Sequence, residues 1–450
     1  MNIDVLVAEI GSTTTKVNAF NDIHSGCPKF LGQGQAPTSV NDGDVNIGLK
    51  NAVNKLQQIL GTHNLTWSEM LATSSAAGGL RMSVHGLVYD MTARAAKEAA
   101  LGAGGIIKIV TAGKLKRTDI AKIKEISPNV ILIAGGVDYG ERDTGIYNFE
   151  VLAKACSNIP MIYAGNIQNQ DEIRFTAAET GVHLYIADNV YPKVDMLNVE
   201  PTRKIIQDVF EEHIIHAPGM TSVRTMVNGP IMPTPGAVME SAKLLYEVLG
   251  DLAVFDVGGA TTDLYSVTEG SNEINSILIS PEPIAKRTVE GDLGVYVNIP
   301  HIVQKVGLEV LKKEFPDAER RIAKAIPIPQ TSEGKRFIEY LTLAAVQTAL
   351  ERHAGKVTET YGPSGKQTVA CGKDLTAVKY IIGTGGALTR LPKRMEILRE
   401  IISKEKGNHL YPKRSTNILI DNLYIMASLG VLSTRYKEAA TVLLKQSLAI

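Results

Sequence analysis

Residues 252–267 read LAVFDVGGATTDLYSV, an apolar run, a turn of glycine and hydroxyl residues, and a second apolar run. This pattern predicts a β-hairpin with a polar tip. Its glycines let backbone amides approach a ligand, its threonines offer hydroxyl groups, and its carboxylates can hold a hydrated metal ion. The tip therefore suits a phosphate chain that carries Mg²⁺, although an ordinary Gly-rich turn between core strands has the same pattern. The residues concerned are Asp256, Gly258, Gly259, Thr261, Thr262 and Asp263.

The amino-terminal stretch 5–20, VLVAEIGSTTTKVNAF, repeats this pattern. Two such hairpins in one chain are what a duplicated fold needs to hold a phosphate chain from both sides. We therefore predict phosphate contacts here as well, and we expect the carboxylate of this hairpin to act in catalysis with the two of the other. The aligned pairs are Glu9 with Asp256, Gly11 with Gly258, and Thr14 with Thr261. The predicted phosphate-binding residues are Gly11, Ser12, Thr13, Thr14 and Lys16.

Residues 379–392, KYIIGTGGALTRLP, predict a strand, a glycine turn and a short helix that Pro392 stops. Together with the two hairpins, this stretch resembles the phosphate and adenosine motifs of the actin, sugar-kinase and heat-shock-chaperone ATPase superfamily. The resemblance implies ATP and Mg²⁺ as ligands, with Asp256 and Asp263 binding or orienting the metal and its waters. It implies an α/β fold of duplicated ribonuclease-H-like domains. The residues that it places beneath the adenosine are Gly383, Gly385, Gly386 and Ala387.

The length and the motifs predict two domains, residues 1–250 and 251–450. A chain of 450 residues with 44% hydrophobic content can bury more than one core. Segments 234–249 and 422–432 are expected to be helices whose small residues allow a close crossing, and we expect them to pivot between the domains. Two apolar runs around a glycine pair in residues 70–88 predict a further hairpin in the first domain.

Residues 106–187 alternate apolar β runs with helical segments, which predicts parallel strands joined by right-handed crossovers. Two interpretations fit this additional parallel βα segment. Gly135 and Gly136 follow the first hairpin at about the distance at which the adenosine turn follows the second, so they could be its counterpart, with Asp138 beside them. Alternatively, residues from about 105 to 200 form an inserted subdomain that binds a partner.

Composition narrows the class of protein. Lys plus Arg and Asp plus Glu both number 47, so no net charge exists to attract nucleic acid or a membrane surface. The sequence shows no basic leader and no apolar run of the roughly 20 residues that span a bilayer, so we expect a cytoplasmic protein. Cys27, Cys156 and Cys371 are far apart and indicate neither a zinc site nor a disulfide framework.

Over nearly its whole length the chain resembles the glutamate mutase accessory proteins known as MutL or GlmL. The resemblance rests on residues 8–15, 75–82, 86–88, 99–104, 134–136, 255–263 and 289–294. It implies an ATPase that reactivates an adenosylcobalamin-dependent mutase by exchanging damaged cobalamin for intact coenzyme. Glu9 stands where most of the superfamily has Asp, and its longer side chain lengthens the reach to metal-bound water.

The chain is not itself expected to be the mutase. Cobalamin carriers present Asp-x-His-x-x-Gly, and the nearest stretch here, residues 22–27, ends in Cys27 in place of the glycine.

Two other functions fit the same fold. A small-molecule kinase would phosphorylate a sugar or a carboxylic acid with a positioned carboxylate as base, and a filament-forming ATPase would only assemble. Dependence of ATP turnover on a small substrate would distinguish the kinase. The sequence does not select among glutamate, ornithine and lysine mutases as the client, and it leaves homo-oligomerisation open.

Overall fold

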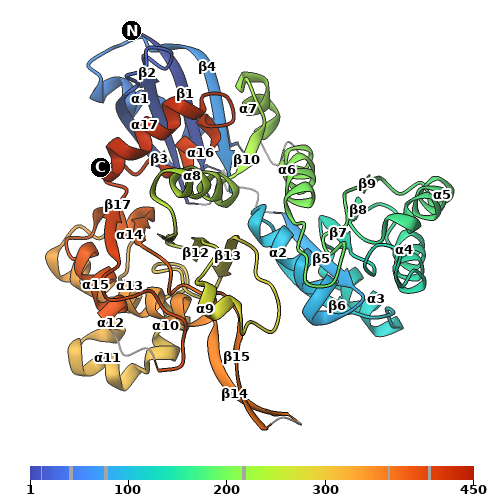
Figure 1. Cartoon of the computed structure of the whole chain (residues 1–450). Helices are drawn as coiled ribbons and strands as arrows, with labels where there is room; N and C mark the ends of the chain where they lie inside the picture. Colours follow the sequence, from blue (N-terminus) through green and yellow to red (C-terminus); the bar gives the residue numbers. More distant parts are fainter. Residues whose placement is uncertain (12, 40–43, 76–79, 215–218, 363–364, 404–406) are drawn as a thin grey trace. The chain divides into compact units, whose positions relative to one another are not determined.

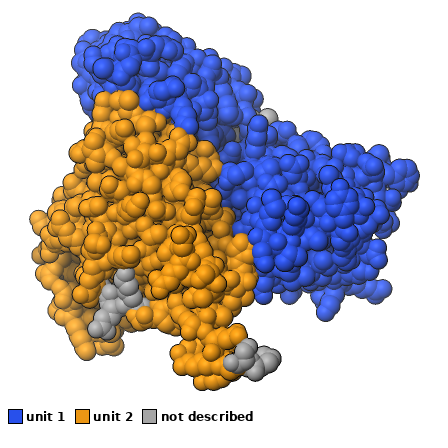
Figure 2. Space-filling view, in the orientation of Figure 1, with its two compact units in different colours: residues 1–238, 430–439 blue, residues 239–429, 440–450 orange. Residues whose placement is uncertain are grey.

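The computed structural model describes residues 1–11, 13–39, 44–75, 80–214, 219–362, 365–403 and 407–450. The chain divides into two compact units, which Figure 2 shows in different colours. Unit 1 comprises Met1–Val238 and Gly430–Ala439, and unit 2 comprises Met239–Leu429 and Ala440–Ile450. The chain therefore passes from one unit to the other three times, in each case within a helix: α8 (Thr234–Leu249), α16 (Met426–Leu432) and α17 (Lys437–Leu448).

The first sheet of unit 1 has the strand order β10-β4-β1-β2-β3. Strands β1, β2 and β3 pair antiparallel, whereas β4 is parallel to β1 and β10 is parallel to β4. Helix α1 (Val45–Ile59) buries Leu49, Ala52 and Leu56 against this sheet. The strands are β1 (Asn2–Ile10), β2 (Thr14–Asn21), β3 (Lys29–Pro37), β4 (Thr66–Ser74) and β10 (Ile231–Pro233).

The sheet of unit 2 repeats this arrangement. Its order is β13-β12-β11-β16-β17, with three antiparallel strands followed by two parallel ones. The strands are β11 (Leu252–Val257), β12 (Thr262–Val267), β13 (Ala285–Glu290), β16 (Tyr380–Thr384) and β17 (Asn417–Ile420). The duplicated ribonuclease-H-like α/β fold expected from the sequence is therefore confirmed.

A second sheet of unit 1, inserted between β4 and β10, is entirely parallel and has the order β6-β5-β7-β8-β9 (Figure 1). Its strands are β5 (Arg81–Gly86), β6 (Ile106–Ala112), β7 (Val130–Ile133), β8 (Met161–Tyr163) and β9 (Leu184–Ile186). The helices between and after them are α2 (Arg94–Gly102), α3 (Arg117–Ile126), α4 (Asp143–Ala155), α5 (Gln170–Thr180) and α6 (Glu200–Ile214). We call this sheet with its helices the doubly wound lobe.

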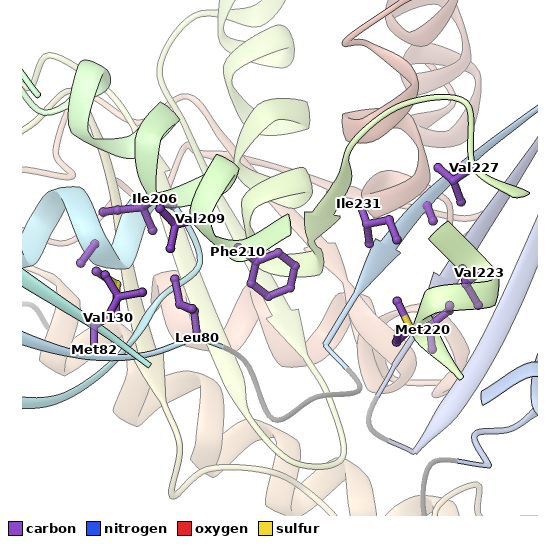
Figure 3. Packing of buried hydrophobic residues seen from close by; sticks show 14 of the residues in the cluster. Leu80, Met82, Val130, Ile206, Val209, Phe210, Met220, Val223, Val227 and Ile231 are labelled. Carbon is purple, nitrogen blue, oxygen red and sulfur yellow. The ribbon is translucent and has the colours of Figure 1, made fainter. Parts of the chain in front are cut away.

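Both faces of the lobe's sheet are covered, and β7 shows how. Val130 and Leu132 join the hydrophobic cluster that contains α2 and α6, and Ile131 and Ile133 join the cluster that contains α3, α4 and α5. Figure 3 shows Ile206, Val209 and Phe210 of α6 beside Leu80, Met82 and Val130. A continuous apolar strand is the pattern expected of a parallel sheet that is buried on both faces.

The hairpin expected in residues 70–88 is wrong. β4 pairs with β1 and β10, whereas β5 pairs with β6 and β7 in the other sheet. The glycines at 78–79 lie outside the described residues. Gly135 and Gly136, the expected counterpart of the adenosine turn, follow β7. Among the described residues, β7 pairs with β5 and β8 and with no strand of the β1 sheet, so these glycines follow a strand of a different sheet from the first hairpin.

The remaining elements of unit 2 flank its sheet. Helix α13 (Ser332–His353) packs on β12 and β13, and β14 (Lys356–Gly362) pairs with β15 (Gly365–Cys371) as a two-stranded ribbon. The other helices are α9 (Asn272–Asn275), α10 (Ile299–Val306), α11 (Leu308–Glu314), α12 (Ala318–Ala323), α14 (Gly385–Arg390) and α15 (Arg394–Ser403). Helix α7 (Met220–Met226) belongs to unit 1. In the described part of the chain, no helix is long and apolar enough to cross a membrane.

The two predicted pivot helices contain close approaches at small residues. A Cβ atom on Gly430 would lie 1.7 Å from the carbonyl oxygen of Ala237, so glycine is required there. Ser241 Oγ donates a hydrogen bond to the carbonyl oxygen of Met426, at 2.6 Å. The later helix begins at Met426 and not at residue 422. Asp421 fixes this start, because it accepts hydrogen bonds from the backbone amides of Ile425, just before the helix, and of Met426, its first residue. Pivoting remains a prediction.

Candidate functional site

The turn of the first hairpin is held by hydrogen bonds from its own backbone and from β3. The Gly11 amide donates to the carbonyl oxygen of Thr14 at 3.0 Å. Thr38, just after β3, donates through its hydroxyl to the carbonyl oxygen of Gly11 at 2.8 Å and through its amide to that of Thr13 at 3.0 Å. Thr13 is exposed and Thr14 is half-buried, so both remain candidates for phosphate contact; Ser12 lies outside the described residues.

The carboxylate of Glu9 is buried beside this turn. Lys16, directly opposite on β2, places Nζ 2.6 Å from Glu9 Oε2, and Asn18 Nδ2 donates to Glu9 Oε1 at 3.1 Å. Glu9 is 4% exposed and Lys16 is 6% exposed. The ammonium group that was predicted to contact phosphate therefore neutralises a buried carboxylate, and the catalytic role of Glu9 stays a prediction.

The second hairpin has the same turn with different charges. The Gly258 amide donates to the carbonyl oxygen of Thr261 at 2.9 Å, as Gly11 does to Thr14. Here, however, the two opposing residues are both acidic, because Asp256 on β11 faces Asp263 on β12. The spacing of the sequence repeat is thus reproduced in the backbone, while a lysine in one hairpin corresponds to an aspartate in the other.

Asp263 is held by a buried arginine that the sequence did not single out. Arg287 on β13 donates to Asp263 Oδ1 through Nε at 3.0 Å and through a terminal nitrogen at 2.7 Å, and Thr261 Oγ1 donates to Asp263 Oδ2 at 3.0 Å. Burial, the largest single influence, lowers the pKa of Arg287, but its interactions with Asp263 and Tyr265 together outweigh burial and the pKa is raised. Both oxygens of this carboxylate accept hydrogen bonds, one of them from Thr261, and metal ligation by Asp263 stays a prediction.

Asp256 is half-buried and lies against the predicted adenosine turn. A Cβ atom on Gly385 would lie 2.4 Å from Asp256 Oδ1 and 2.6 Å from the amide nitrogen of Val257. Gly385 also has φ of +83°, a conformation that side chains disfavour. The fold thus brings together the carboxylate of β11 and the glycine turn after β16, which are more than a hundred residues apart in sequence.

The other residues of the adenosine turn occupy the end of β16 and the start of α14. A Cβ atom on Gly383 would lie 3.0 Å from side-chain atoms of both Ile420 and Leu398, and Ala387 is buried. A Cβ atom on Gly386 would meet nothing within 4 Å, so the described structure leaves space at this position. Thr384 between them donates to Asp421 Oδ2 at 2.8 Å, which ties the turn to the start of α16.

Residues 289–298 contact the turn of the second hairpin. A Cβ atom on Gly294 would lie 2.2 Å from the carbonyl carbon of Ala260. The Tyr296 amide donates to the carbonyl oxygen of Gly259 at 3.0 Å, and Thr262 Oγ1 donates to that of Leu293 at 2.7 Å. The glycine-rich motif 289–294, which carried part of the family resemblance, therefore fixes the turn in place.

Two further carboxylates beside this turn, those of Glu290 and Asp292, were not predicted from the sequence as site residues. Arg352 of α13 is ion-paired with Glu290 and donates to both carboxylate oxygens of Asp292, at 2.8 and 2.9 Å. Burial raises the pKa of Glu290 despite Arg352, whereas the hydrogen bond from Arg352 lowers the pKa of Asp292. Glu290 faces Thr262 across the strands, so a carboxyl group with raised proton affinity borders the predicted phosphate site.

Asp256 and Asp263 are the carboxylates predicted to bind Mg²⁺. Mg²⁺ in nucleotide sites is held by one or two carboxylates, by substrate phosphates and by water. Asp263 accepts hydrogen bonds from Arg287 and Thr261, and the binding of Mg²⁺ by Asp256 and Asp263 stays a prediction.

Comparison with known proteins identifies relatives over the whole chain. The sequence model described as MutL protein matches residues 5–448. A protein named Protein MutL from Clostridium tetanomorphum is 35% identical, and the match covers 98% of each chain.

Solved structures that resemble the chain include two nucleotide-free proteins. Acetone carboxylase is 10% identical with a TM-score of 0.41, and the match covers 96% of this chain and 70% of that one. Diol dehydratase-reactivating factor is 10% identical with a TM-score of 0.36, over 96% of this chain and 99% of that one. Because both TM-scores are low, the fold assignment rests on the strand orders described above.

Proposed function

Because this chain belongs to the MutL protein family, we propose that it is an ATP-dependent reactivating factor for an adenosylcobalamin-dependent mutase. We propose glutamate (methylaspartate) mutase as the client, with ornithine and lysine aminomutases as the alternatives. In this function the protein binds ATP with Mg²⁺ and uses hydrolysis to open an inactivated mutase, so that spent cobalamin leaves and intact coenzyme enters. ATP can drive such a change only if the nucleotide binds the two states of the complex with different affinity.

The observation that carries the proposal is the repeated hairpin turn. The Gly11–Thr14 and Gly258–Thr261 hydrogen bonds give the two units the same backbone geometry where their sequences repeat. We propose that each of these turns is a phosphate-binding turn and that the adenosine of ATP lies on Gly383 to Ala387 in unit 2. The space at Gly386 supports the adenosine position, and so does the close approach to Asp256 Oδ1 that a Cβ atom on Gly385 would make.

The side chains have distinct roles in this proposal. Asp256 orients Mg²⁺ and its waters, which would supply the charge stabilisation that phosphoryl transfer needs. Asp263, neutralised by Arg287, fixes the hydroxyl of Thr261 at the turn. Glu290, whose pKa burial raises, is placed to accept a proton near the turn.

Client-stimulated hydrolysis tests the proposal and separates its alternatives. ATP turnover is measured alone and with glutamate, ornithine or lysine mutase inactivated by hydroxocobalamin. We expect one of the three inactivated mutases to stimulate turnover, and we expect the active form of the same mutase to stimulate it less. Stimulation by none of them, or stoichiometric phosphorylation of a small metabolite, would favour the kinase instead.

A further inference from the structure

A cavity of about 810 Å³ lies in unit 1, lined by helices α1 and α7 and by strands β1 and β4. Sites for small molecules have volumes of roughly 300–1,000 Å³, so the cavity can hold a ligand of that class. Among the described residues, none of those predicted to contact phosphate or adenosine lines it. The cavity is therefore a candidate site for a ligand other than ATP.

The floor of the cavity is apolar and includes an aromatic ring. Leu6 of β1, Leu49 of α1 and Met70 of β4 line it and are buried. Val53 and Trp67 also line it and are half-buried. Apolar surface that a ligand buries against these side chains stabilises the complex, and the indole of Trp67 adds a flat face on which a ring can stack. The floor therefore suits a ligand that carries an apolar ring.

One wall is fixed by hydrogen bonds between the starts of α1 and α7. Asp44, the N-cap of α1, accepts hydrogen bonds at Oδ1 from the amide of Asn46 at 2.9 Å and from its Nδ2 at 2.6 Å. Ser222 Oγ donates to Asn46 Oδ1 at 2.8 Å, and Asn46 Nδ2 donates to the carbonyl oxygen of Gly219 at 3.2 Å. The bonds from Asn46 lower the pKa of Asp44, and the charge of Lys50 has a smaller effect in the same direction. Asp44 is therefore a carboxylate whose charge is already stabilised as a helix cap.

Three other side chains of the lining are available to bind a polar group of a ligand. They belong to Lys50, Asn54 and Trp67, and within the described chain none of the three makes a hydrogen bond or an ion pair. An ammonium group and an indole N–H only donate, whereas the amide of Asn54 both donates and accepts. Lys50 and Asn54 are four residues apart on α1, so they share one face of the helix. These groups match a carboxylate, which accepts hydrogen bonds and carries the charge opposite to that of Lys50.

We propose that this cavity binds an aromatic carboxylate, with the ring on Trp67 and the carboxylate on Lys50 and Asn54. A neutral ring would leave the ammonium group of Lys50 without a counter-charge. A cationic ligand would have Asp44 as its counter-charge, and that carboxylate already caps α1. The carboxylate of the ligand is expected at Lys50 and not at Asp44, because like charges repel each other. The inference does not rest on the proposed function.

The fluorescence of Trp67 reports on this cavity, because Trp67 is the single tryptophan of the chain. Anilinonaphthalene sulfonate, an aromatic anion that absorbs where tryptophan emits, is titrated into the full-length protein, and energy transfer from Trp67 is measured. Naphthalene carboxylate should displace this probe with an affinity about tenfold higher than that of neutral naphthalene carboxamide, which has the same rings. Saturating ATP with Mg²⁺ should leave the binding of the probe unchanged.

Three variants of α1 test the roles of its side chains. Lys50→Met keeps the apolar stem and removes the charge, so it should weaken binding of the carboxylate about tenfold and leave binding of the carboxamide unchanged. Val53→Glu brings a negative charge into the lining and should also weaken binding of the carboxylate. Ile59→Glu is the matched control, because Ile59 is on the same helix, is 63% exposed and does not line the cavity. It should bind both compounds like the wild type.

The absence of energy transfer from Trp67 would overturn the site. Equal displacement by the carboxylate and the carboxamide would overturn it too, and so would a Lys50→Met variant that binds both compounds like the wild type. Loss of the probe on addition of ATP would place the probe at the nucleotide turns and contradict a separate cavity. ATP-dependent reactivation is not affected by any of these outcomes, so the failure of this inference and the failure of the proposed function are distinguishable.

Discussion

The two hairpins share a backbone and differ in how their carboxylates are neutralised. In unit 1, Glu9 is ion-paired with Lys16, its opposite residue, and both are buried. In unit 2 the opposite residues are Asp256 and Asp263, and the neutralising cation, Arg287, comes from the neighbouring strand and pairs with Asp263. Duplication thus preserved the turn that suits phosphate, while the charges diverged. The chemistry is therefore expected to be concentrated in unit 2, at Asp256.

Removing Arg287 should have the largest effect on stability. Arg287→Met leaves Asp263 buried without its cation, and breaking a buried pair in this way costs about 3–5 kcal/mol of unfolding free energy. Urea unfolding measures the loss. Adding Asp263→Asn should recover part of it, and Arg174→Met, which removes an exposed pair with Asp171, should change stability by less than about 1 kcal/mol. A loss that the double variant does not reduce would contradict the pairing.

Substitutions at Glu9 and at Asp256 should lower ATP turnover by different amounts. Asp256→Asn should lower ATP turnover on the order of 100-fold, which is about 2.7 kcal/mol, because it removes charge directed at the transferring phosphoryl group. Glu9→Gln should lower it by less, since Glu9 is already paired with Lys16. Steady-state turnover compares them, with Glu309→Gln, an exposed carboxylate on α11, as the control. Equal losses at Glu9 and Asp256 would show that the units contribute alike.

The two turns should also differ in their tolerance of a methyl group. A Cβ atom on Gly11 would lie 2.6 Å from the carbonyl oxygen of Thr14, whereas one on Gly258 would lie 3.3 Å from that of Thr261. Gly11→Ala should therefore destabilise by about 1–3 kcal/mol and Gly258→Ala by less. Thermal unfolding of the two variants side by side gives the comparison. The reverse ranking would mean that the turns are not built as described.

Two buried histidines should have the smallest effect on the free energy of unfolding at neutral pH. Burial lowers the pKa of His85 in the lobe to about 3, and burial also lowers the pKa of His353 behind the second hairpin. The unfolded histidines bind protons below about pH 6.5 while the folded ones do not, so stability falls as pH drops through that value. Each contributes up to about 1.4 kcal/mol per pH unit.

His353→Gln should flatten this dependence. Urea unfolding at about pH 5 and pH 7 should show a smaller difference for the variant than for the wild type. Gln can still accept or donate one of the hydrogen bonds that His353 makes with Ser266 and Thr288. An unchanged difference would mean that His353 is protonated in the folded protein.

Local patterns predicted the parts of the fold that neighbouring residues determine. Both hairpins, the glycine turn after β16 and the alternating segments of the lobe follow from short apolar runs and glycine positions. The pair Arg287–Asp263 could not be predicted in this way, because it joins different strands through a sheet register. For the same reason the sequence did not predict the pairing of β5 with β7, which lies more than forty residues later in the chain. The ion pairs of Arg352 with Glu290 and Asp292 could not be predicted either, because Arg352 belongs to a helix that is distant in sequence.

The central claim is that hydrolysis at Asp256 drives cobalamin exchange in a client mutase. The most direct test mixes hydroxocobalamin-inactivated mutase with adenosylcobalamin, Mg²⁺ and the protein, and measures recovered mutase activity with ATP, with a non-hydrolysable analogue, and with Asp256→Asn in place of the wild type. The account predicts recovery only for the wild-type protein with ATP. Recovery without ATP, or full recovery with Asp256→Asn, would contradict it.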